Sequence, residues 1–504
     1  MLLFIVFAPL VTALLVLLGA PARLTSLLGA GATLLATLVA FVSYNVARGG
    51  YQFVTAWPIS ANAGLSFSLG ADGLSLVMLL LAALVLLCAI WFTPAIEKSE
   101  RLFYACLFFV AAGAIGAFAS LDLFFFYAFH ELALIPTFLL IGIWGTGNRF
   151  GAAWKVTIYL ALGSFVLLIG LLLLYRSVPV DARSFDLRAL QAAANAGAIS
   201  ASAQKQIFLL LLIGFGVLIS LFPFHSWAPE AYASAPAPAA MLHAGVLKKF
   251  GLYGLLRIAL PMLPLGARHW SSLLLVLLLG NIIYVGLVTI AQKRLDWMLG
   301  YSSVMHMGYI LLGVASANLI GVNGAAVLMF AHGISIALLF AIAGEIRRRT
   351  GTLALSELGG FGKMMPFAGF TFGVATFAAI GLPGFANFAG EIMIFFGAFR
   401  VGAAWNGFHI FQIATVLALW GVVMSAVYML RAYRAIFMGA PNEQWTMLPD
   451  LAKTLRAPVI LLIAATVIVG FWPEGLLRVL RPTFSSGVGQ SRASHSEAAT
   501  TDAR

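Results

Sequence analysis

The chain has 504 residues, of which 62% are hydrophobic and only 9% are charged. This composition excludes a soluble globular protein and is typical of a chain that crosses a membrane many times. The formal net charge of +12 does not indicate a nucleic-acid surface, because the basic residues are spread over short connections. Cys88 and Cys106 lie within apolar runs and predict neither a disulfide nor a metal site. Without a CxxC motif or a glycine-rich phosphate loop, we expect no redox cofactor, nucleotide or metal in this chain.

Apolar runs of roughly 20 residues, the length that spans a bilayer, recur along the whole chain. We expect them near residues 2–19, 25–46, 72–94, 101–119, 121–143, 152–175, 205–222, 238–260, 268–291, 301–316, 321–346, 366–402, 411–436 and 456–474. The first run has no preceding positive charge and is predicted to be a span and not a signal peptide. The chain is therefore predicted to be an all-α polytopic membrane protein with about 14 transmembrane helices. The one sizeable polar connection, 178–206, is expected to carry a short amphipathic helix.

The distribution of lysine and arginine predicts how the chain is oriented. Connections after odd-numbered spans hold most of the basic residues, including Arg347 and its two arginine neighbours. Leaving aside the long polar connection and the tail, the other connections hold only Arg48, Arg257, Arg268 and Arg400. Because positively charged connections stay in the cytoplasm, the first set is expected there. Both termini are then predicted to lie on the outer, periplasmic side.

Proline and glycine interrupt two of the apolar runs. The first interruption is Leu-Phe-Pro-Phe-His at 221–225, and the second is Gly-Leu-Pro-Gly-Phe at 381–385. Such breaks free backbone groups that need protein or water as partners at membrane depth. Paired breaks in two halves indicate a transporter built from inverted repeats, each containing a discontinuous helix.

We therefore predict five segments along the chain. They are N-terminal transmembrane helices at 1–100, a first five-helix inverted repeat at 101–260, a second at 261–436, a C-terminal transmembrane helix at 437–484 and a tail at 485–504. The tail is small and polar in composition and is expected to be disordered.

Ionisable residues inside the apolar runs are few. A lysine at the bilayer centre costs roughly 2.5–3.5 kcal/mol on insertion scales, so it is rarely present without a task. Glu131 and Glu391 are the acidic residues well inside such runs. The basic ones are Lys248, Lys249, His130, His243, His306 and His332. Because burial disfavours the charged form of acids and bases alike, these groups can exchange protons. A line of them at mid-membrane predicts a proton relay.

Each of these residues also has a simpler structural interpretation. An intramembrane glutamate can clamp two helices together, and His306 and His332 can be hydrogen-bonded core residues. Lys248 can extend its long side chain to an interface. His130 neighbours Glu131 but faces another side of the helix, so we expect it to be structural.

The motifs around these residues resemble, in the same order, those of the antiporter-like subunits of respiratory complex I. The matching segments are 126–145 around Glu131, 223–232 with Pro-Phe-His-Ser-Trp, 245–254 with the paired lysines, 301–309, 331–333 and 382–394. The similarity covers nearly the whole chain. A glutamate at position 391 makes the M-type members, the fourth-subunit type, the nearest match.

The resemblance implies a proton relay that contains Glu131, Lys249, His306, His332 and Glu391, and we add the buried Lys248 to it as a further candidate. Glu131 would be the carboxylate whose charge pairing gates the channel, and Lys249 would be the central lysine. Glu391 would be the terminal residue, on the second broken helix. Protons would load from the cytoplasm, and charge coupling to neighbouring subunits would drive their release outside.

The resemblance also implies the molecular context. The chain would be a subunit of a proton-translocating NADH:quinone oxidoreductase in the bacterial inner membrane, beside L-type and N-type antiporter-like subunits. NADH, FMN, iron–sulfur clusters and quinone would lie in partner subunits, with no redox chemistry in this chain. The alternatives are a subunit of an Mrp-type cation/proton antiporter, a subunit of an energy-converting hydrogenase, and a non-pumping structural copy.

One position departs from the family pattern. Where the family normally has a lysine five residues before the proline of the Pro-x-His-x-Trp motif, this chain has Leu218. Glu131 therefore lacks its usual cationic partner. Lys248, at a position that is usually apolar, can supply the missing charge, and we favour this account. Alternatively His130 or His243 supplies it, or this copy uses an altered route or does not pump.

Overall fold

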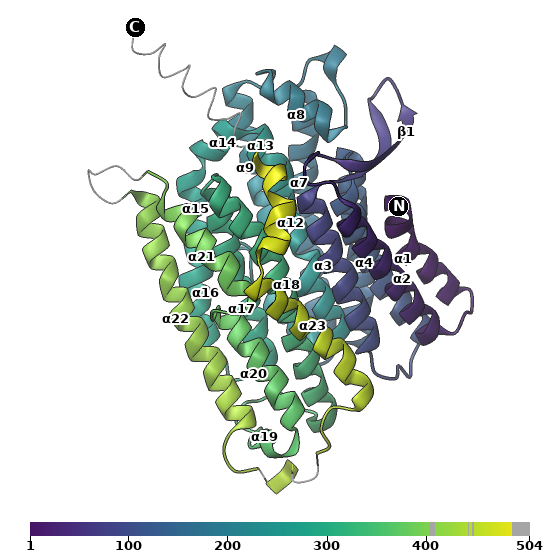
Figure 1. Ribbon diagram of the computed structural model, residues 1–504, viewed down its shortest axis with the longest axis vertical. Helices are drawn as coiled ribbons and strands as arrows, with labels where there is room; N and C mark the ends of the chain where they lie inside the picture. Colours follow the sequence, from purple (N-terminus) through teal and green to yellow (C-terminus); the bar gives the residue numbers. More distant parts are fainter. Residues whose placement is uncertain (403–408, 442, 446–447, 486–504) are drawn as a thin grey trace.

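The computed structural model describes residues 1–402, 409–441, 443–445 and 448–485. Within these residues, eleven helices are long and apolar enough to cross a membrane. Three shorter apolar helices accompany them, namely α1 (Leu2–Leu17), α20 (Pro366–Ile380) and α21 (Ala386–Phe399). Most helices run close to the long axis of the molecule (Figure 1). The predicted class of all-α polytopic membrane protein is confirmed, and the count of about fourteen spans stays a prediction.

The remaining helices follow in chain order. Up to residue 262 they are α2 (Ala22–Ser43), α3 (Gly73–Trp91), α4 (Glu100–Ala119), α5 (Leu123–Leu132), α6 (Leu134–Trp144), α7 (Arg149–Arg176), η1 (Val180–Ala182), α8 (Leu187–Asn195), α9 (Ala201–Ile219), α10 (Trp227–Ser234), α11 (Ala237–Leu242), η2 (His243–Leu247), α12 (Lys249–Gly254), η3 (Leu255–Ala259) and α13 (Leu260–Met262). After it they are α14 (Pro264–His269), α15 (Ser271–Leu279), η4 (Gly280–Tyr284), α16 (Val285–Ala291), α17 (Leu295–Ala315), α18 (Leu319–Thr350), α19 (Phe361–Met364), α22 (Ile410–Phe437), η5 (Glu443–Trp445) and α23 (Lys453–Phe471).

A small β hairpin, which the sequence did not predict, lies beside α8 at one end of the molecule (Figure 1). Its antiparallel strands are β1 (Gln52–Ser60) and β2 (Leu65–Ala71). The short helix expected in the polar connection is confirmed as α8, which Asp186 caps by accepting hydrogen bonds from the backbone N–H groups of Arg188 and Ala189. Burial raises the pKa of Asp186, but hydrogen bonds from Arg188 outweigh it and hold that pKa below its usual range.

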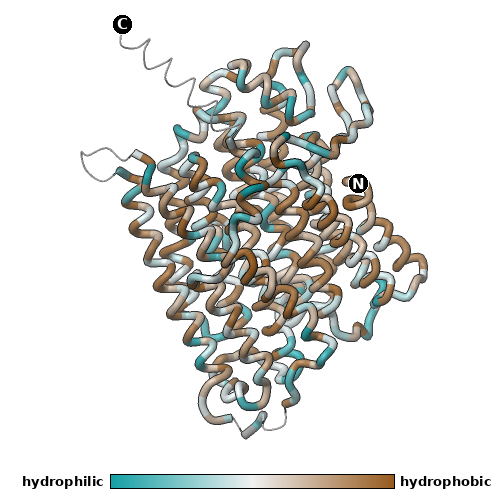
Figure 2. The backbone as a smooth tube through the Cα atoms, in the orientation of Figure 1, coloured by the Kyte–Doolittle hydropathy of each residue, from teal (hydrophilic) through white to brown (hydrophobic). Residues whose placement is uncertain are grey.

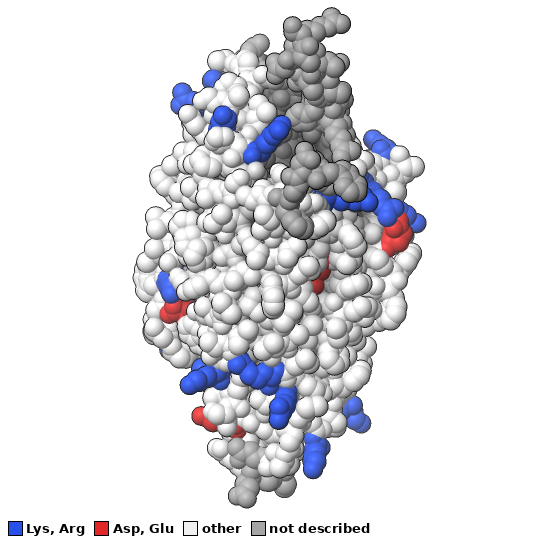
Figure 3. All heavy atoms as spheres, turned by 90° about the vertical axis from the view of Figure 1, so that its left-hand side faces the viewer, with Lys and Arg blue, Asp and Glu red and all other residues white. Residues whose placement is uncertain are grey.

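Helices α17 and α18 form the centre of the molecule, and α18 is buried along its whole apolar stretch. Outer helices expose large apolar side chains such as Leu35 on α2, Phe165 on α7 and Trp420 on α22. Hydrophobic residues dominate the middle of the molecule, and hydrophilic residues are most frequent near its two ends (Figure 2). One face shows the same pattern, with a sparsely charged middle and lysine and arginine gathered towards the ends (Figure 3). This distribution is that of a protein surrounded by lipid at its waist.

The first predicted helix break is confirmed at the end of α9. Ser220 takes a left-handed conformation with φ of 66°, and α10 begins only at Trp227. Asn281 of η4 satisfies the freed backbone. Its Oδ1 accepts from the N–H of Phe222 at 2.6 Å, and its Nδ2 donates to the carbonyl of Ser220 at 3.1 Å. A buried amide therefore replaces water at this break.

The second predicted break is confirmed between α20 and α21. Gly381 ends α20 with φ of 81°, a left-handed conformation that favours glycine. The assignment of 101–260 and 261–436 to inverted repeats stays a prediction. The tail predicted at 485–504 lies outside the described residues apart from Ser485, which ends a helical segment over 474–485.

The sequence placed Arg257 in a connection, and the structure corrects this. Arg257 lies within η3, where its guanidinium binds the carboxylate of Asp72 through Nη1–Oδ2 at 2.7 Å and Nη2–Oδ1 at 2.5 Å. Asp72 caps α3 from a distant part of the chain. Because the carboxylate of Asp72 accepts two hydrogen bonds from the guanidinium, the charge of Arg257 can lie in the interior of the protein. Sequence alone could not pair these two residues across 185 positions.

Candidate functional site

The paired lysines both point into the protein interior. Lys248 is 1% exposed and Lys249 is fully buried. The preceding segment, η2, is a π-helical turn, and the N–H of Lys248 bonds the carbonyl of His243, five residues earlier, at 3.1 Å. Single π-helical turns inside α-helices are frequent at functional sites. Two adjacent buried lysines directly after such a turn identify the segment from η2 to α12 as the centre of the candidate site.

Lys249 contacts a histidine on the central helix. Its Nζ donates to the carbonyl of Ala244 at 2.7 Å and lies 2.9 Å from Nδ1 of His332, in the middle of α18. Among the described residues, no carboxylate lies within ion-pair distance of this ammonium. A charge on Lys249 is therefore balanced by no fixed counter-ion in this part of the chain.

His306 of α17 lies next to His332, and both of its ring nitrogens are within hydrogen-bond distance of a carbonyl. Its ring centroid lies 5.4 Å from that of His332. Its Nδ1 lies 2.8 Å from the carbonyl of Ser302, and its Nε2 lies 2.9 Å from the carbonyl of Ala379. A carbonyl only accepts, so both hydrogen bonds form together only when both ring nitrogens carry protons. Whichever ring nitrogen carries the proton, a carbonyl is in place to accept from it.

The broken helix explains why the carbonyl of Ala379 is free to bind His306. In a continuous helix its donor would be the N–H of residue 383, but Pro383 has none. The carbonyl also lies at the C-terminal end of α20, where the helix dipole favours a positive charge. The sequence-predicted break thus creates a binding position for a protonated histidine.

Glu391 lies on the other side of the same break. It belongs to α21, is 3% exposed, and its Oε1 has no hydrogen-bond partner among the described residues. Gly381 faces it so closely that a Cβ there would collide with its Oε2. His306 on α17 therefore contacts Ala379, and Glu391 on α21 contacts Gly381, so the two side chains lie against the same end of α20.

Substituting Gly381 tests this close approach. Gly381→Ala forces a side chain into the left-handed region and against Glu391, so it is expected to destabilise the protein by more than the roughly 1–2 kcal/mol of the left-handed strain alone. Gly147→Ala is the matched control, because Gly147 has φ of 63° and no atom near its Cβ position. The thermal unfolding midpoints of the two variants give the comparison. Equal losses would contradict the packing of Gly381 against Glu391.

Glu131 lies apart from the lysines. It is partly buried on α5, and its Oε1 accepts a hydrogen bond from the hydroxyl of Ser164 on α7. His130 faces α12 instead, where its ring stacks on Phe250 with centroids 4.1 Å apart and planes 10° apart. The prediction that His130 and Glu131 face different sides of the helix is confirmed.

The direct pairing of Lys248 with Glu131, which the sequence favoured, is not present among the described residues. Lys248 Nζ donates to Ser303 Oγ at 3.3 Å and lies 5.3 Å from the ring centroid of Tyr232. Leu218 is buried in α9 at 3% exposure and supplies no charge. Lys248 and Glu131 do not meet because Glu131 points towards α7 while Lys248 points towards α10 and α17.

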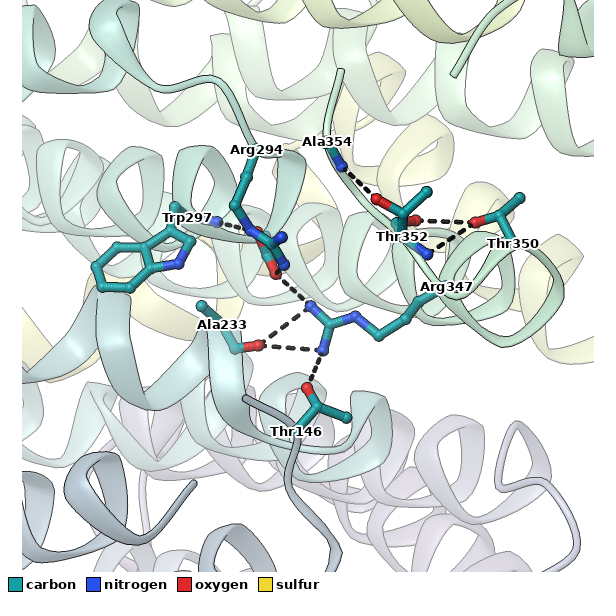
Figure 4. Close-up of polar contacts among 9 residues, drawn as sticks. Thr146, Ala233, Arg294, Trp297, Arg347, Thr350, Thr352 and Ala354 are labelled. Carbon is teal, nitrogen blue, oxygen red and sulfur yellow. Dashed lines mark hydrogen bonds and ion pairs between the residues drawn. The ribbon is translucent and has the colours of Figure 1, made fainter. Parts of the chain in front are cut away.

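A polar cluster that sequence reasoning missed joins the two halves of the chain. Asp296, at the start of α17, accepts from Arg294 at 2.8 Å and also binds Arg347 of α18. Arg347 donates to Thr146 Oγ1 at 2.9 Å and to the carbonyl of Ala233, at the end of α10, at 3.1 Å from each terminal nitrogen (Figure 4). The available signal was the arginine triplet 347–349, which indicated only membrane topology.

Comparison with known proteins agrees with this architecture. Residues 120–418 match the family described as NADH:quinone oxidoreductase/Mrp antiporter, transmembrane. NADH-quinone oxidoreductase subunit M of Rickettsia felis is 33% identical over 459 residues, which cover 90% of each chain. A NAD(P)H-quinone oxidoreductase chain 4 of Synechococcus sp. is 36% identical over 438 residues, covering 86% of this chain and 80% of the relative.

Solved structures show the same fold. A chain of respiratory complex I from Thermus thermophilus with bound NADH superposes with a TM-score of 0.88 at 28% identity, covering 97% of this chain and 99% of the other. A chain of the Mrp complex from Dietzia sp. superposes with a TM-score of 0.83 at 22% identity, covering 97% of each, and shows the fold alone. The chain therefore belongs to the NADH:quinone oxidoreductase/Mrp antiporter family of transmembrane subunits, and it is similar to the subunit M and chain 4 members.

Proposed function

We propose that this chain translocates protons as a membrane-arm subunit of a complex I-type NADH:quinone oxidoreductase. The observation that carries the proposal is the contact of Lys249 Nζ with His332 Nδ1 at 2.9 Å, fully buried and without a fixed counter-ion in the described chain. The names of the subunit M and chain 4 relatives support the assignment to such a complex.

In this proposal the proton moves along α12, α18 and α17 to the second helix break. Lys249 gives its proton to the unprotonated Nδ1 of His332, and His332 passes one to His306, whose imidazolium form the two carbonyls stabilise. Glu391 takes the proton next, across the unwound segment. A charge that moves without a counter-ion in a low-dielectric interior acts on neighbouring subunits over long distances, which provides the coupling.

Glu131 and Lys248 complete the proposed relay. Glu131, which accepts a hydrogen bond from Ser164, lies apart from Lys249. We infer that residues 101–260 and 261–436 act as the two halves, one containing the lysines and the other Glu391. Lys248 lies at the intake side, where its hydroxyl partner Ser303 faces it.

The proposal extends to the surroundings of the chain. L-type and N-type antiporter-like subunits would be its neighbours, in the inner membrane of a bacterium with both termini outside. NADH, FMN, iron–sulfur clusters and quinone would lie in other subunits of the complex. The exposed apolar faces of α7 and α22 provide surfaces for lipid and for these neighbours.

Purification of the assembly from its native membrane tests the proposal. Flavin and iron–sulfur subunits should co-purify, and NADH oxidation by a quinone should acidify one side of sealed vesicles. Recovery of small hydrophobic partners alone, with proton movement driven by a sodium or potassium gradient, would instead identify an Mrp-type antiporter. Hydrogenase subunits in place of the NADH-oxidising ones would identify an energy-converting hydrogenase.

A further inference from the structure

A cavity of about 900 Å³ opens at the end of the molecule where the arginine triplet lies. Its walls come from the segment after α3, the connection after α6, helices α10 and α11, the start of α17 and the end of α18. Its polar lining includes Glu97, Lys98, Asn148, Glu230 and Asp296. Because this volume is large and its lining is charged, water will fill it. The positive residues around it place it, by the topology rule, on the cytoplasmic side.

Tyr232 is one of the residues that line this cavity. It is only 2% exposed, so most of its surface faces the interior. Its hydroxyl lies 3.3 Å from Nδ1 of His243, and its ring centroid lies 5.3 Å from Nζ of Lys248. One side chain therefore touches the water-filled cavity, a buried histidine and the first of the two lysines.

The position of Tyr232 is fixed from the cavity side. The next residue, Ala233, accepts through its carbonyl from both terminal nitrogens of Arg347 (Figure 4). Ser234 accepts in turn from the N–H of Thr146 at 2.8 Å. Because α10 is held at these points by the second half of the chain and by the connection after α6, the Tyr232 hydroxyl has a defined place.

We propose that Tyr232, His243 and Lys248 form the proton-uptake group of this chain and join the cavity to Lys249. The inference rests on the proposed function and adds where its protons come from. It also gives Lys248 a role at a position that is usually apolar in the family. Since Leu218 stands where the first broken helix normally carries a charge, Lys248 takes over proton loading from a different direction.

The transfer balances with one proton in and one proton out. The Tyr232 hydroxyl gives its proton to Nδ1 of His243 while a hydronium ion in the cavity returns one to the Tyr232 oxygen. His243, now an imidazolium, releases the proton from Nε2, which has no hydrogen-bond partner among the described residues. The amine of Lys248 receives it through water, because no direct hydrogen bond joins the two groups. The resulting ammonium repels a proton on the adjacent Lys249 and drives it towards His332. Lys249, now a neutral amine, then takes the proton of Lys248, so one proton has entered for the one that left.

Tyr232→Phe tests the hydroxyl and keeps the ring against Lys248. Because proton-transfer groups typically contribute about 10²–10⁴-fold, coupled turnover of the intact complex is expected to fall at least about tenfold. Acidifying the cavity side should restore part of it, since hydronium supply then limits the rate. Tyr175→Phe is the matched control and should keep the wild-type rate, because its hydroxyl bonds the carbonyl of Ala63, outside this group.

Lys248→Met separates uptake from the rest of the relay. Combined with Tyr232→Phe, it should lower turnover no further than either change alone, because both act on one step. If Tyr232→Phe pumps at the wild-type rate while Lys249→Ala does not, protons load elsewhere and this inference fails but the proposed function stands. If neither variant affects pumping, the proposed function fails with it.

Labelling tests the cavity without any measurement of activity. Ala237 lines it, whereas the native Cys88 and Cys106 are buried. A cysteine introduced by Ala237→Cys should make this chain react with a charged, membrane-impermeant thiol reagent in inside-out vesicles of the intact complex, and the same chain in the wild-type complex should not react. Absence of labelling, or labelling only from the outer face, would overturn the assignment of this cavity to proton uptake.

Discussion

Replacing Arg257 by methionine is expected to destabilise the protein by about 3–5 kcal/mol, because the change leaves a buried carboxylate without its partner. The side chains of Arg257 and Asp72 are only 10% and 4% exposed, and they meet through two short hydrogen bonds. Tyr253 and Ser75 add hydroxyl contacts to the guanidinium at 3.3 and 3.4 Å. Little water can therefore reach the carboxylate of Asp72 to solvate it once the guanidinium is removed.

A double-mutant cycle measures this pair. Asp72→Asn keeps an acceptor for the α3 cap, and the double variant Asp72→Asn/Arg257→Met should be less damaged than the sum of the single variants, because no unpaired charge remains. Arg481→Met is the control, since its pair with Glu474 is exposed and should matter by less than about 1 kcal/mol. Thermal unfolding midpoints of the purified complex give the values. Additive single effects would show that the ion pair is not coupled.

Lys249→Ala is expected to lower coupled turnover at least about tenfold, because it removes the buried base that, in the proposed relay, exchanges protons with His332. The loss of one amine from a fully buried site could also disturb packing, so the amount of assembled complex must be measured beside the rate. Lys205→Ala is the matched control, because Lys205 is an exposed lysine at the start of α9. Turnover that is unchanged in both variants would identify a non-pumping structural copy.

The sequence predicted the fold class because its signals are local. Apolar runs of spanning length, the proline and glycine at the two breaks and the polar stretch that became α8 each depend on neighbouring residues only. The β hairpin was missed because Gln52–Ser60 and Leu65–Ala71 carry a much weaker pattern than the spans around them.

The sequence predicted which residues belong to the candidate site but not which groups they contact. Burial of Lys249, His306 and His332 follows from their place in apolar runs, but one carbonyl partner of His306, that of Ala379, lies on a helix 73 residues away. That Lys248 supplies the charge missing at position 218 stays a prediction; its hydrogen bond goes to Ser303, while Glu131 accepts from Ser164. Tyr232 closes the matched segment 223–232, but only the cavity beside it marks it as a candidate site residue.

The central claim is that protons cross this chain through Lys249. The most direct test is the number of protons translocated per electron, measured with the complex in proteoliposomes for wild type, Lys249→Ala and Lys205→Ala. The account predicts a lower ratio for the residual turnover of Lys249→Ala and the wild-type ratio for Lys205→Ala. An assembled Lys249→Ala complex with both turnover and ratio unchanged would contradict it.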